Sequence, residues 1–451
     1  MLIILLVSCS KNNSVPPYTP PVITPVTDST PAQYGTPFKG VPNRQDASIY
    51  QVNIRAFSQS GNFQGVIARL DSIKALGVNV IYLMPIYPVG TLKSINSPYC
   101  VKDYKSVNSE FGSLADLRAL VDGAHSRNIS VMLDWVANHT SWDNSWITNH
   151  KNWYLQDASG NIQIPPGYSD VAQLNFSNDS MRLAMIADMK YWVFTANIDG
   201  FRCDYADNPP VSFWQQAIDT LRNISTHSLL LLAEGSRNTN FSAGFDYNFG
   251  FSFYSNLKSI YSSNTSALTI DNLNTTEYTN TTGGQQVVRY ITNHDVNSSD
   301  GTPLSLFGGK SGSLAAFTIV ACMKSVPMIY NGQEVGMTTP IMFPFTIGKI
   351  DWTTGLDQTA EYKKIIAFRN SSNAIRRGTL TSYSNADICA FITQNNTDKV
   401  LVIANLRNKA IQYTLPAALA NTTWTDALIS GNMALTSQLT LQPYEYFVLK
   451  N

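Results

Sequence analysis

Strand-like apolar runs alternate with helix-like runs between residues 48 and 330, and this alternation limits the possible folds more than any other feature of the chain. The spacing of apolar residues switches repeatedly between the period of a strand and that of a helix. Such a pattern predicts parallel strands joined by right-handed helical crossovers. Eight strand-like runs are present, which is the number that closes a TIM (β/α)8 barrel. The runs cover residues 48–53, 78–83, 129–134, 197–203, 229–233, 245–249, 287–292 and 326–330, with helices expected over 63–76, 114–126, 179–195 and 210–223.

Two regions depart from this pattern. Residues 139–179 lack a clear period and interrupt the alternation after the third strand, and long irregular stretches in compact domains are usually functional. From residue 371 onward, short alternating segments such as 400–405 predict an antiparallel β-sandwich. We therefore expect a catalytic barrel over residues 46–370 and a C-terminal β-sandwich domain over 371–451.

The first 45 residues are predicted to form a targeting signal and a tether, not part of a folded domain. An apolar run ends at Leu6-Val7-Ser8-Cys9, which resembles a bacterial lipoprotein signal peptide with Cys9 as the lipidated residue. The run is shorter than the roughly 20 residues that span a bilayer. Residues 10–43 are rich in Pro, Thr and Ser, a composition typical of an extended tether. We expect a lipid-anchored protein of the bacterial cell envelope, on the outer membrane, the cell surface or the periplasmic face; the alternative is an unprocessed disordered stub.

The composition of the chain indicates which kinds of partner it binds. Lys+Arg and Asp+Glu are balanced at 31 each, so the net charge gives no reason to expect a nucleic acid or another polyanion as partner. Only 14% of residues are charged and 11% are aromatic, which suits a neutral polyhydroxylated ligand. The cysteines and histidines lack the spacing of a zinc site. We expect a monomer that touches a membrane only through its lipid.

Three acidic residues each lie just past a strand-like run. Asp204 follows the fourth run, Glu234 the fifth and Asp295 the seventh. Because the carboxyl ends of parallel strands meet at one rim of a barrel, we expect these side chains to converge there. Arg202 lies two residues before Asp204, on the same face of its strand, where a cation favours an ionised carboxylate. A pair of carboxyl groups about 5 to 5.5 Å apart is what glycoside hydrolysis with retention requires.

Four short motifs around these acids specify the chemistry further. They are Asp-Trp-Val-Ala-Asn-His at 134–139, Gly-Phe-Arg-Cys-Asp at 200–204, Ala-Glu-Gly at 233–235 and Thr-Asn-His-Asp at 292–295. In this order they resemble the four signature regions of the alpha-amylase family, glycoside hydrolase family 13. The resemblance implies a TIM barrel with a small B domain at residues 139–179. It also implies a retaining hydrolase of α-1,4-glucosidic bonds in starch-derived glucans or maltooligosaccharides.

The resemblance also implies a role for each matched residue. Asp204 is expected to be the nucleophile, Glu234 the general acid/base, and Asp295 the residue that orients the substrate. Substrate contacts are expected from Tyr99, His139, Arg202 and His294, and structural support from Asp103, Asp134 and Asn138. Trp142, Trp146, Trp153 and Trp352 are further candidate sugar platforms.

Two departures from the family pattern affect metal binding and specificity. The Lys-His pair that many members carry after the nucleophile is replaced by Asp207-Asn208, which removes contacts to the leaving sugars. The Asp of a short motif before Leu-Asn is replaced by Gln173. Of the usual calcium ligands only Asn138 remains, and hard cations need several well-placed oxygens. We therefore expect no required cofactor and do not predict a metal ligand set; calcium is possible, but its usual family site is incomplete.

The motifs leave other activities open. An α-1,6-glucosidase or a transglycosylase of the same family would carry the same three acids, so these acids cannot discriminate between them. A non-catalytic glycan-binding protein is a further alternative. Such a protein would usually have lost one of the acids, and all three are present here.

Overall fold

The structure is a computed structural model that describes residues 31–451. The predicted lipidation site, Cys9, lies outside the described residues. Across residues 31–451, no helix combines the length and the apolar character that crossing a bilayer requires.

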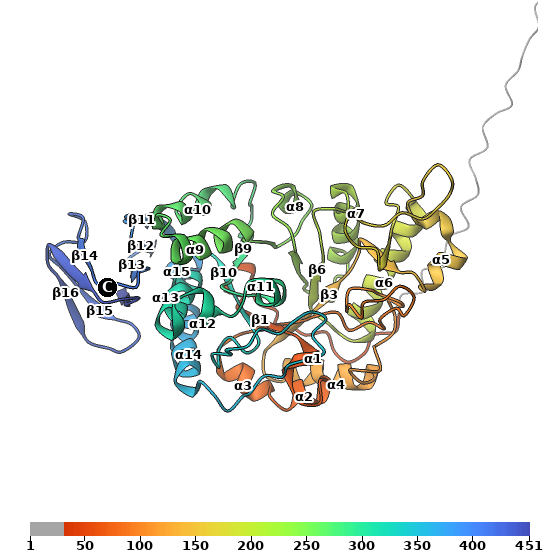
Figure 1. The fold of residues 1–451 in the computed structure, drawn as a ribbon, viewed down its shortest axis with the longest axis horizontal. Helices are drawn as coiled ribbons and strands as arrows, with labels where there is room; N and C mark the ends of the chain where they lie inside the picture. Colours follow the sequence, from red (N-terminus) through yellow and green to blue (C-terminus); the bar gives the residue numbers. More distant parts are fainter. Residues whose placement is uncertain (1–30) are drawn as a thin grey trace, which may run out of the picture.

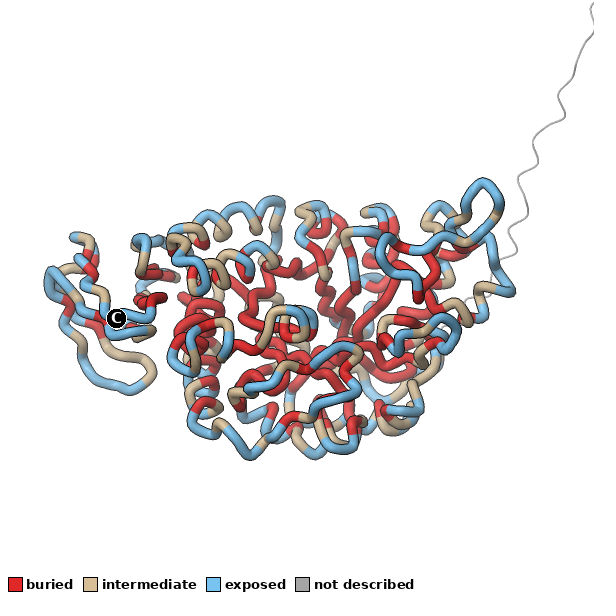
Figure 2. The backbone as a smooth tube through the Cα atoms, viewed as in Figure 1, coloured by how far each residue is buried: buried red, intermediate tan, exposed pale blue. Residues whose placement is uncertain are grey.

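Eight parallel strands close into a barrel in the order β1-β10-β9-β8-β7-β6-β3-β2, which confirms the predicted TIM barrel. All strands of the barrel are buried (Figure 2), as expected for strands with a packed interior on one side and helices on the other. The strands are β1 (Ile49–Val52), β2 (Val80–Leu83), β3 (Ser130–Trp135), β6 (Gly200–Cys203), β7 (Leu230–Ala233), β8 (Tyr247–Phe249), β9 (Gln286–Arg289) and β10 (Val326–Tyr330).

Helices surround the barrel (Figure 1) and follow the predicted alternation. The helix expected over residues 63–76 is two helices, because Arg69 leaves the helical path with φ −114° and ψ 8°. The longer helices are α4 (Leu114–His125), α6 (Asp179–Thr195), α7 (Val211–Arg222), α9 (Phe251–Ser263), α13 (Gly309–Cys322) and α14 (Leu356–Ser371). The short helices are α1 (Ile54–Phe57), α2 (Phe63–Ile67), α3 (Leu70–Ala75), α5 (Ser145–Asn149), α8 (Thr239–Ser242), α10 (Leu273–Thr276), α11 (His294–Ser299), α12 (Pro303–Leu306) and α15 (Asn373–Arg377).

A glycine starts the strand that carries the central motif. Gly200 has φ +155°, and a Cβ at this position would lie 2.0 Å from the carbonyl oxygen of Leu230 on β7. Only glycine therefore lets β6 approach β7 this closely. The close approach sets the register in which Arg202 and Cys203 pair with Leu232 and Ala233.

The expected C-terminal β domain is present. It contains a six-stranded sheet of order β11-β12-β13-β18-β15-β16 and a two-stranded sheet of β14 and β17, all antiparallel. The domain packs beside α13 (Figure 1), and Arg407 ties it to the barrel by donating to the carbonyl oxygens of Ile260 and Thr265. The strands are β11 (Thr379–Ser382), β12 (Ile388–Asn395), β13 (Asp398–Asn405), β14 (Ile411–Thr414), β15 (Thr422–Asp426), β16 (Asn432–Leu435), β17 (Gln438–Leu441) and β18 (Tyr446–Lys450).

The end of the Pro/Thr-rich stretch lies against the barrel. The amide N–H of Tyr34 donates to the Phe194 carbonyl oxygen at 2.8 Å, and Asn197 Nδ2 donates to the Thr36 carbonyl oxygen at 2.9 Å. Arg44 pairs with Asp246 at 2.6 Å. Asn197 lies three residues before β6, and Asp246 directly precedes β8. This segment therefore runs along the amino ends of the strands, opposite the carboxyl-terminal rim.

Candidate active site

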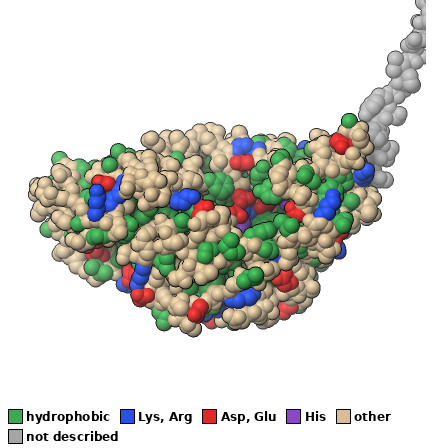
Figure 3. All heavy atoms as spheres, in the orientation of Figure 1, with side chains coloured by type: hydrophobic (Ala, Val, Ile, Leu, Met, Phe, Trp, Pro, Cys, Tyr) green, Lys and Arg blue, Asp and Glu red, His purple; other side chains and the backbone are tan. Residues whose placement is uncertain are grey.

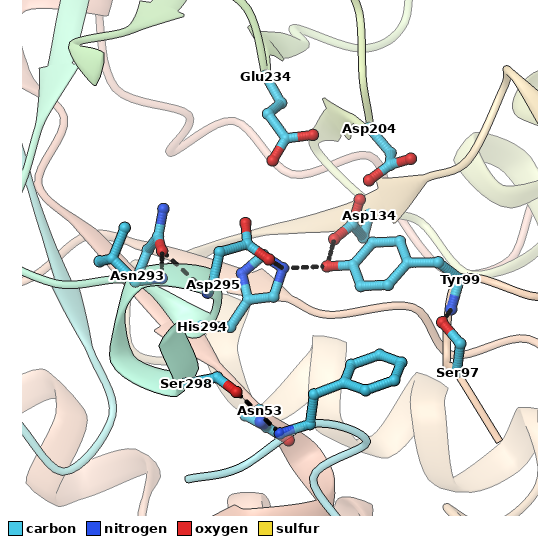
Figure 4. A network of polar contacts seen from close by, with 12 residues as sticks. Asn53, Ser97, Tyr99, Asp134, Asp204, Glu234, Asn293, His294, Asp295 and Ser298 are labelled. Carbon is cyan, nitrogen blue, oxygen red and sulfur yellow. Dashed lines mark hydrogen bonds and ion pairs between the residues drawn. The ribbon is translucent and has the colours of Figure 1, made fainter. Parts of the chain in front are cut away.

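The three motif acids meet at the carboxyl-terminal rim of the barrel. Asp204 directly follows β6 and Glu234 directly follows β7, and these two strands are neighbours in the sheet. Asp295 comes from α11, beyond the end of β9. Figure 4 shows the carboxylates of Asp204, Glu234 and Asp295 directed toward one shared space, and Figure 3 shows acidic and histidine side chains gathered in a hollow of the surface.

One guanidinium links the acids. Arg202 Nη1 lies 2.7 Å from Asp134 Oδ1 and 2.9 Å from Asp204 Oδ1, and Nη2 pairs with Glu234 Oε1. Asp134 is fully buried because β3 pairs with β6 and places Asp134 directly opposite Arg202. The contact holds the carboxyl groups of Asp204 and Glu234 beside each other, as a double-displacement reaction requires.

The pKa of Asp204 is raised well above its usual range. Burial is the main cause, and the nearby charge of Glu234 raises the pKa further, while Arg202 opposes both effects. We expected Arg202 to keep Asp204 ionised, and its contact does lower the pKa. Three carboxylates share this one cation, however, so burial and repulsion outweigh it.

A local cap positions Asp295. The side-chain oxygen of Asn293 accepts hydrogen bonds from the N–H groups of Asp295 and Val296, both at 2.9 Å, and so starts α11. The Asp295 side chain remains 58% exposed, whereas that of Asp204 is 12% exposed. Asp295 is therefore available to a ligand entering from solvent.

A hydrogen-bonded chain orders the side chains below the acids. Gln51 Nε2 lies 2.7 Å from His294 Nδ1, and because an amide nitrogen only donates, this ring nitrogen carries no proton. His294 Nε2 then donates to Tyr99 Oη at 2.7 Å, and Tyr99 donates to Asp134 Oδ2 at 3.0 Å. The chain fixes the ring of Tyr99, the predicted sugar platform, beside the acids.

Both motif histidines are neutral near pH 7. Burial lowers the pKa of His139 to about 4 and that of His294 to about 4, the latter with a further contribution from the charge of Arg202. Each ring can therefore offer one donor and one acceptor. This suits hydrogen bonds to sugar hydroxyls better than an ion pair.

The acids line a cavity of about 800 Å³. Its volume lies within the range that ligand pockets usually have. Its lining includes Tyr99, His139, His294, Asn138, Asp204, Glu234 and Asp295 among the predicted site residues, together with Ile95, Tyr168, Tyr205, Asp207, Phe251, Phe343 and Phe345.

Other predicted residues lie outside the cavity lining. Asp103 is exposed and caps its own turn by accepting from the Lys105 N–H at 2.9 Å and from Ser106 Oγ at 2.5 Å. None of the four tryptophans proposed as sugar platforms lines the cavity. Trp142, for example, donates to the Ser169 carbonyl oxygen and lies under Lys93. Their rings instead pack within the loops around the barrel.

An amide cluster occupies the place of the incomplete calcium site. Asn138 Oδ1 accepts from Asn208 Nδ2 at 2.6 Å and from Gln173 Nε2 at 3.0 Å, and Gln173 Nε2 also lies 2.9 Å from the Asn138 carbonyl oxygen. Two N–H donors thus point at the side-chain oxygen that a cation would need. These three residues do not fit calcium, which binds six to eight oxygens, usually with carboxylates among them.

Sequence reasoning missed several residues of the site, among them Gln51, Tyr168 and Tyr205. Gln51 supports His294 from 243 positions away, which no local motif reveals. Tyr168 and Tyr205 line the cavity and are exposed. A bulky aromatic residue directly after a strand-end acid, as at Tyr205, is the signal that could have been noticed.

Comparisons with known proteins agree with the motifs. The model of the family "Alpha amylase, catalytic domain" matches residues 28–159 and 144–422. The protein "Alpha-amylase 2" of Dictyoglomus thermophilum is 26% identical over 424 residues, covering 86% of this chain and 70% of that protein. An oligo-1,6-glucosidase of Parageobacillus thermoglucosidasius is 29% identical over 199 residues, covering 36% of this chain and 34% of that protein. The crystal structure of a noncanonic maltogenic alpha-amylase from Thermotoga neapolitana has the same fold, with a TM-score of 0.81, 22% identity, and coverage of 91% of this chain and 99% of that chain.

Proposed function

The chain belongs to the alpha-amylase family and is a glycoside hydrolase, and on this premise we propose that it cleaves α-1,4-glucosidic bonds in starch-derived glucans or maltooligosaccharides with retention of configuration. The observation that carries the proposal is the pairing of Asp204 and Glu234 with one guanidinium at the wall of the cavity. Retaining hydrolysis uses two carboxyl groups that lie close together, whereas inverting enzymes hold them further apart.

The first step forms a covalent glycosyl-enzyme. Asp204 attacks the anomeric carbon while Glu234 donates a proton to the glycosidic oxygen, so that the leaving sugar departs with its hydroxyl restored. Tyr99, His139 and His294 hold the ring that is attacked. Asp295, which is exposed to the cavity, binds hydroxyl groups of that ring and steadies the positive charge that develops on it.

The second step releases the sugar. Glu234, now a carboxylate, takes a proton from water, and the water oxygen attacks the anomeric carbon and displaces Asp204. Two inversions restore the original α configuration. Arg202 stays paired with Asp134 throughout and stabilises Asp204 as it leaves as a carboxylate.

Product analysis tests this proposal. Purified protein is incubated with soluble starch, maltoheptaose and pullulan, and the products are separated by chromatography while NMR reads the anomeric configuration of the first product. Turnover of starch and maltoheptaose with initial α products supports the proposal. Turnover of none of the three substrates, or initial β products, would refute it.

The similarity to an oligo-1,6-glucosidase supports a second candidate function. An enzyme of that class would cleave α-1,6 links, or transfer the glycosyl group to another sugar, with the same three acids. Panose, which contains both an α-1,4 and an α-1,6 link, distinguishes the two. Release of glucose and maltose identifies the α-1,6 bond as the one cut, release of glucose and isomaltose identifies the α-1,4 bond, and longer products indicate transfer.

As the pH falls, activity should be lost with a midpoint that lies above the pKa of an ordinary aspartate, about 3.9. Burial and the charge of Glu234 raise the pKa of Asp204, and Asp204 attacks only when ionised, so protonation begins to inactivate the enzyme at a higher pH. The profile of kcat/KM for α-maltosyl fluoride reports this pKa in the free enzyme, because fluoride departs without a proton from Glu234. An acid midpoint at or below about pH 4 would contradict the raised pKa.

We also propose that no calcium ion is needed at Asn138, because Gln173 and Asn208 already satisfy its side-chain oxygen. EDTA should then shift Tm by less than about 2 °C, which for a chain of this size corresponds to less than about 2 kcal/mol. Differential scanning calorimetry with EDTA, and again after excess calcium chloride, makes the comparison. A large fall in Tm that calcium reverses would contradict the proposal.

The N-terminal motif supports a proposal about location. We propose that Cys9 carries a lipid and anchors the protein to a bacterial cell envelope, because it ends an apolar run and precedes a Pro/Thr-rich stretch. In cells that process lipoproteins, the wild type should partition into the detergent phase of Triton X-114, and Cys9→Ser into the aqueous phase. The same partition for both proteins would contradict it.

A further inference from the structure

Three aromatic side chains of residues 31–451 are exposed, and all three line the catalytic cavity. Tyr168 is 57% exposed, and Tyr205 and Phe343 are each 44% exposed. The other aromatic side chains of the described chain are buried or half-buried. Because large aromatic rings normally gain stability from burial, their exposure at this one place calls for a ligand that covers them.

Tyr205 is held in an unusual backbone conformation. Its φ of +46° is rare for a bulky residue, since the left-handed region is crowded for any side chain beyond glycine. Two hydrogen bonds fix this turn: the Tyr205 N–H donates to Glu234 Oε2 at 2.7 Å, and the Ala206 N–H donates to the Glu234 carbonyl oxygen at 2.9 Å. Strain of this kind concentrates at functional sites.

The contacts of Tyr205 place it on the side of the leaving sugar. A general acid lies next to the oxygen that it protonates, so the leaving sugar must lie beside Glu234. Asp207 and Ser236 line the cavity in the same region, and the N–H of Ser236 donates to Asp207 Oδ2 at 2.9 Å. This loop is therefore fixed around the general acid.

Phe343 belongs to a group of rings beside His294. Its ring centroid is 5.5 Å from that of Phe345, and the Phe345 centroid is 6.0 Å from that of His294. His294 in turn stacks beside Tyr99, with ring centroids 5.5 Å apart. Phe343 thus extends the group of rings that would hold the attacked sugar and the sugar units that precede it in the substrate.

Tyr168 lies in the insertion over residues 139–179 and is the second exposed tyrosine of the cavity. Both tyrosine side chains line the cavity that Asp204 and Glu234 line. Tyr205 directly follows Asp204 in the sequence, and the neighbours of Tyr168 in the insertion, Ser169 and Asp170, line the same cavity. Two exposed aromatic rings from separate segments can contact one sugar from different sides.

We propose that Tyr205 and Tyr168 bind the first sugar on the leaving side and determine which leaving groups the enzyme accepts. Their rings pack against the apolar face of that sugar, and their hydroxyls bond to its hydroxyl groups. They take over contacts that the family's Lys-His pair, absent here, would supply. The inference rests on the proposed glycosidase function and names part of its specificity.

Two substrates that differ only after the cleaved bond test this inference. Maltotetraose places sugars on the leaving side, whereas α-maltosyl fluoride places only a fluoride ion there. Tyr205→Asn removes the ring, and asparagine tolerates the left-handed conformation, so the turn is kept. We expect kcat/KM for maltotetraose to fall roughly tenfold more than kcat/KM for the fluoride. Tyr205→Phe should bring the ratio of the two values back toward that of the wild type, and Tyr168→Ala should shift it in the same direction as Tyr205→Asn.

Phe343→Ala is the matched control, since its ring is equally exposed but belongs to the group of rings beside His294 and not to the loop at Glu234. This variant should lower kcat/KM for both substrates by a similar factor. Equal losses for both substrates with Tyr205→Asn, at an unchanged Tm, would overturn the role of Tyr205. A wild type that turns over neither substrate would overturn the proposed function and this inference together, so the two failures are distinguishable.

Discussion

Replacing Asp204 by asparagine should lower kcat/KM for maltoheptaose by roughly 10⁴-fold or more, in line with the loss of other catalytic nucleophiles. Asparagine has almost the same shape but a neutral amide that does not attack the anomeric carbon. The substitution leaves Arg202 paired with Asp134 and Glu234, so the cluster keeps its geometry. Initial rates at several substrate concentrations give kcat/KM, and calorimetry gives Tm.

Stability should not fall in this variant. Burial and the charge of Glu234 raise the pKa of Asp204, so the ionised carboxylate is unfavourable in the folded protein, and a neutral amide removes that cost. We therefore expect Asp204→Asn to have a Tm equal to or above that of the wild type. A fall in activity accompanied by a large fall in Tm would indicate unfolding rather than loss of the nucleophile.

Asp188 offers a matched control. Its side chain is 8% exposed and pairs with Lys105 at 3.0 Å, outside the cavity lining. Burial raises the pKa of Asp188 to about 6, so an amide is tolerated there as well. Asp188→Asn should keep kcat/KM within a few-fold of the wild type. If Asp204→Asn retained activity to the same extent, the assignment of the nucleophile would be wrong.

The barrel could be predicted because its signals are local. Apolar strands and amphipathic helices alternate with different periods, and the carboxyl end of each strand follows from the direction of the chain. The predicted ends of the strands and helices were less accurate. The strand expected over residues 197–203 begins only at Gly200, because Asn197 has φ +56°, which no strand residue adopts. Such left-handed positions depend on contacts made after folding, here with Thr36 of the N-terminal segment.

The meeting of the three acids at one rim could be predicted, but their environment could not. Asp204 and Glu234 each follow a strand-like run, and the ends of parallel strands meet at one rim of a barrel. The raised pKa of Asp204 depends on how many carboxylates share Arg202 and how deeply they are buried, which only the packed barrel determines. Likewise, nothing in the sequence shows that Gln51 meets His294 or that Tyr205 lies beside Glu234.

Glu234→Gln should give the second large loss, about 10²- to 10⁴-fold in kcat/KM for maltoheptaose, which is the usual contribution of general acid catalysis. Glutamine cannot give a proton to the glycosidic oxygen. It also cannot accept from both the Tyr205 N–H and Arg202, as the Glu234 carboxylate does, because only one of its two terminal atoms is an acceptor. Tm is therefore measured in parallel, to separate loss of the acid from disturbance of the loop.

The dependence on the leaving group identifies the role of Glu234 directly. With α-maltosyl fluoride the departing ion needs no proton, so formation of the glycosyl-enzyme should be much less impaired in Glu234→Gln than it is with maltoheptaose. Hydrolysis of that intermediate still lacks its base, and azide, a nucleophile that needs no deprotonation, should accelerate turnover and yield α-maltosyl azide. Because Asp204 occupies the opposite face of the sugar in the intermediate, azide must enter on the α face. An equal loss for both substrates, or no azide product, would mean that Glu234 does not act as the acid and base, and the leaving side of the cavity would have to be reassigned with it.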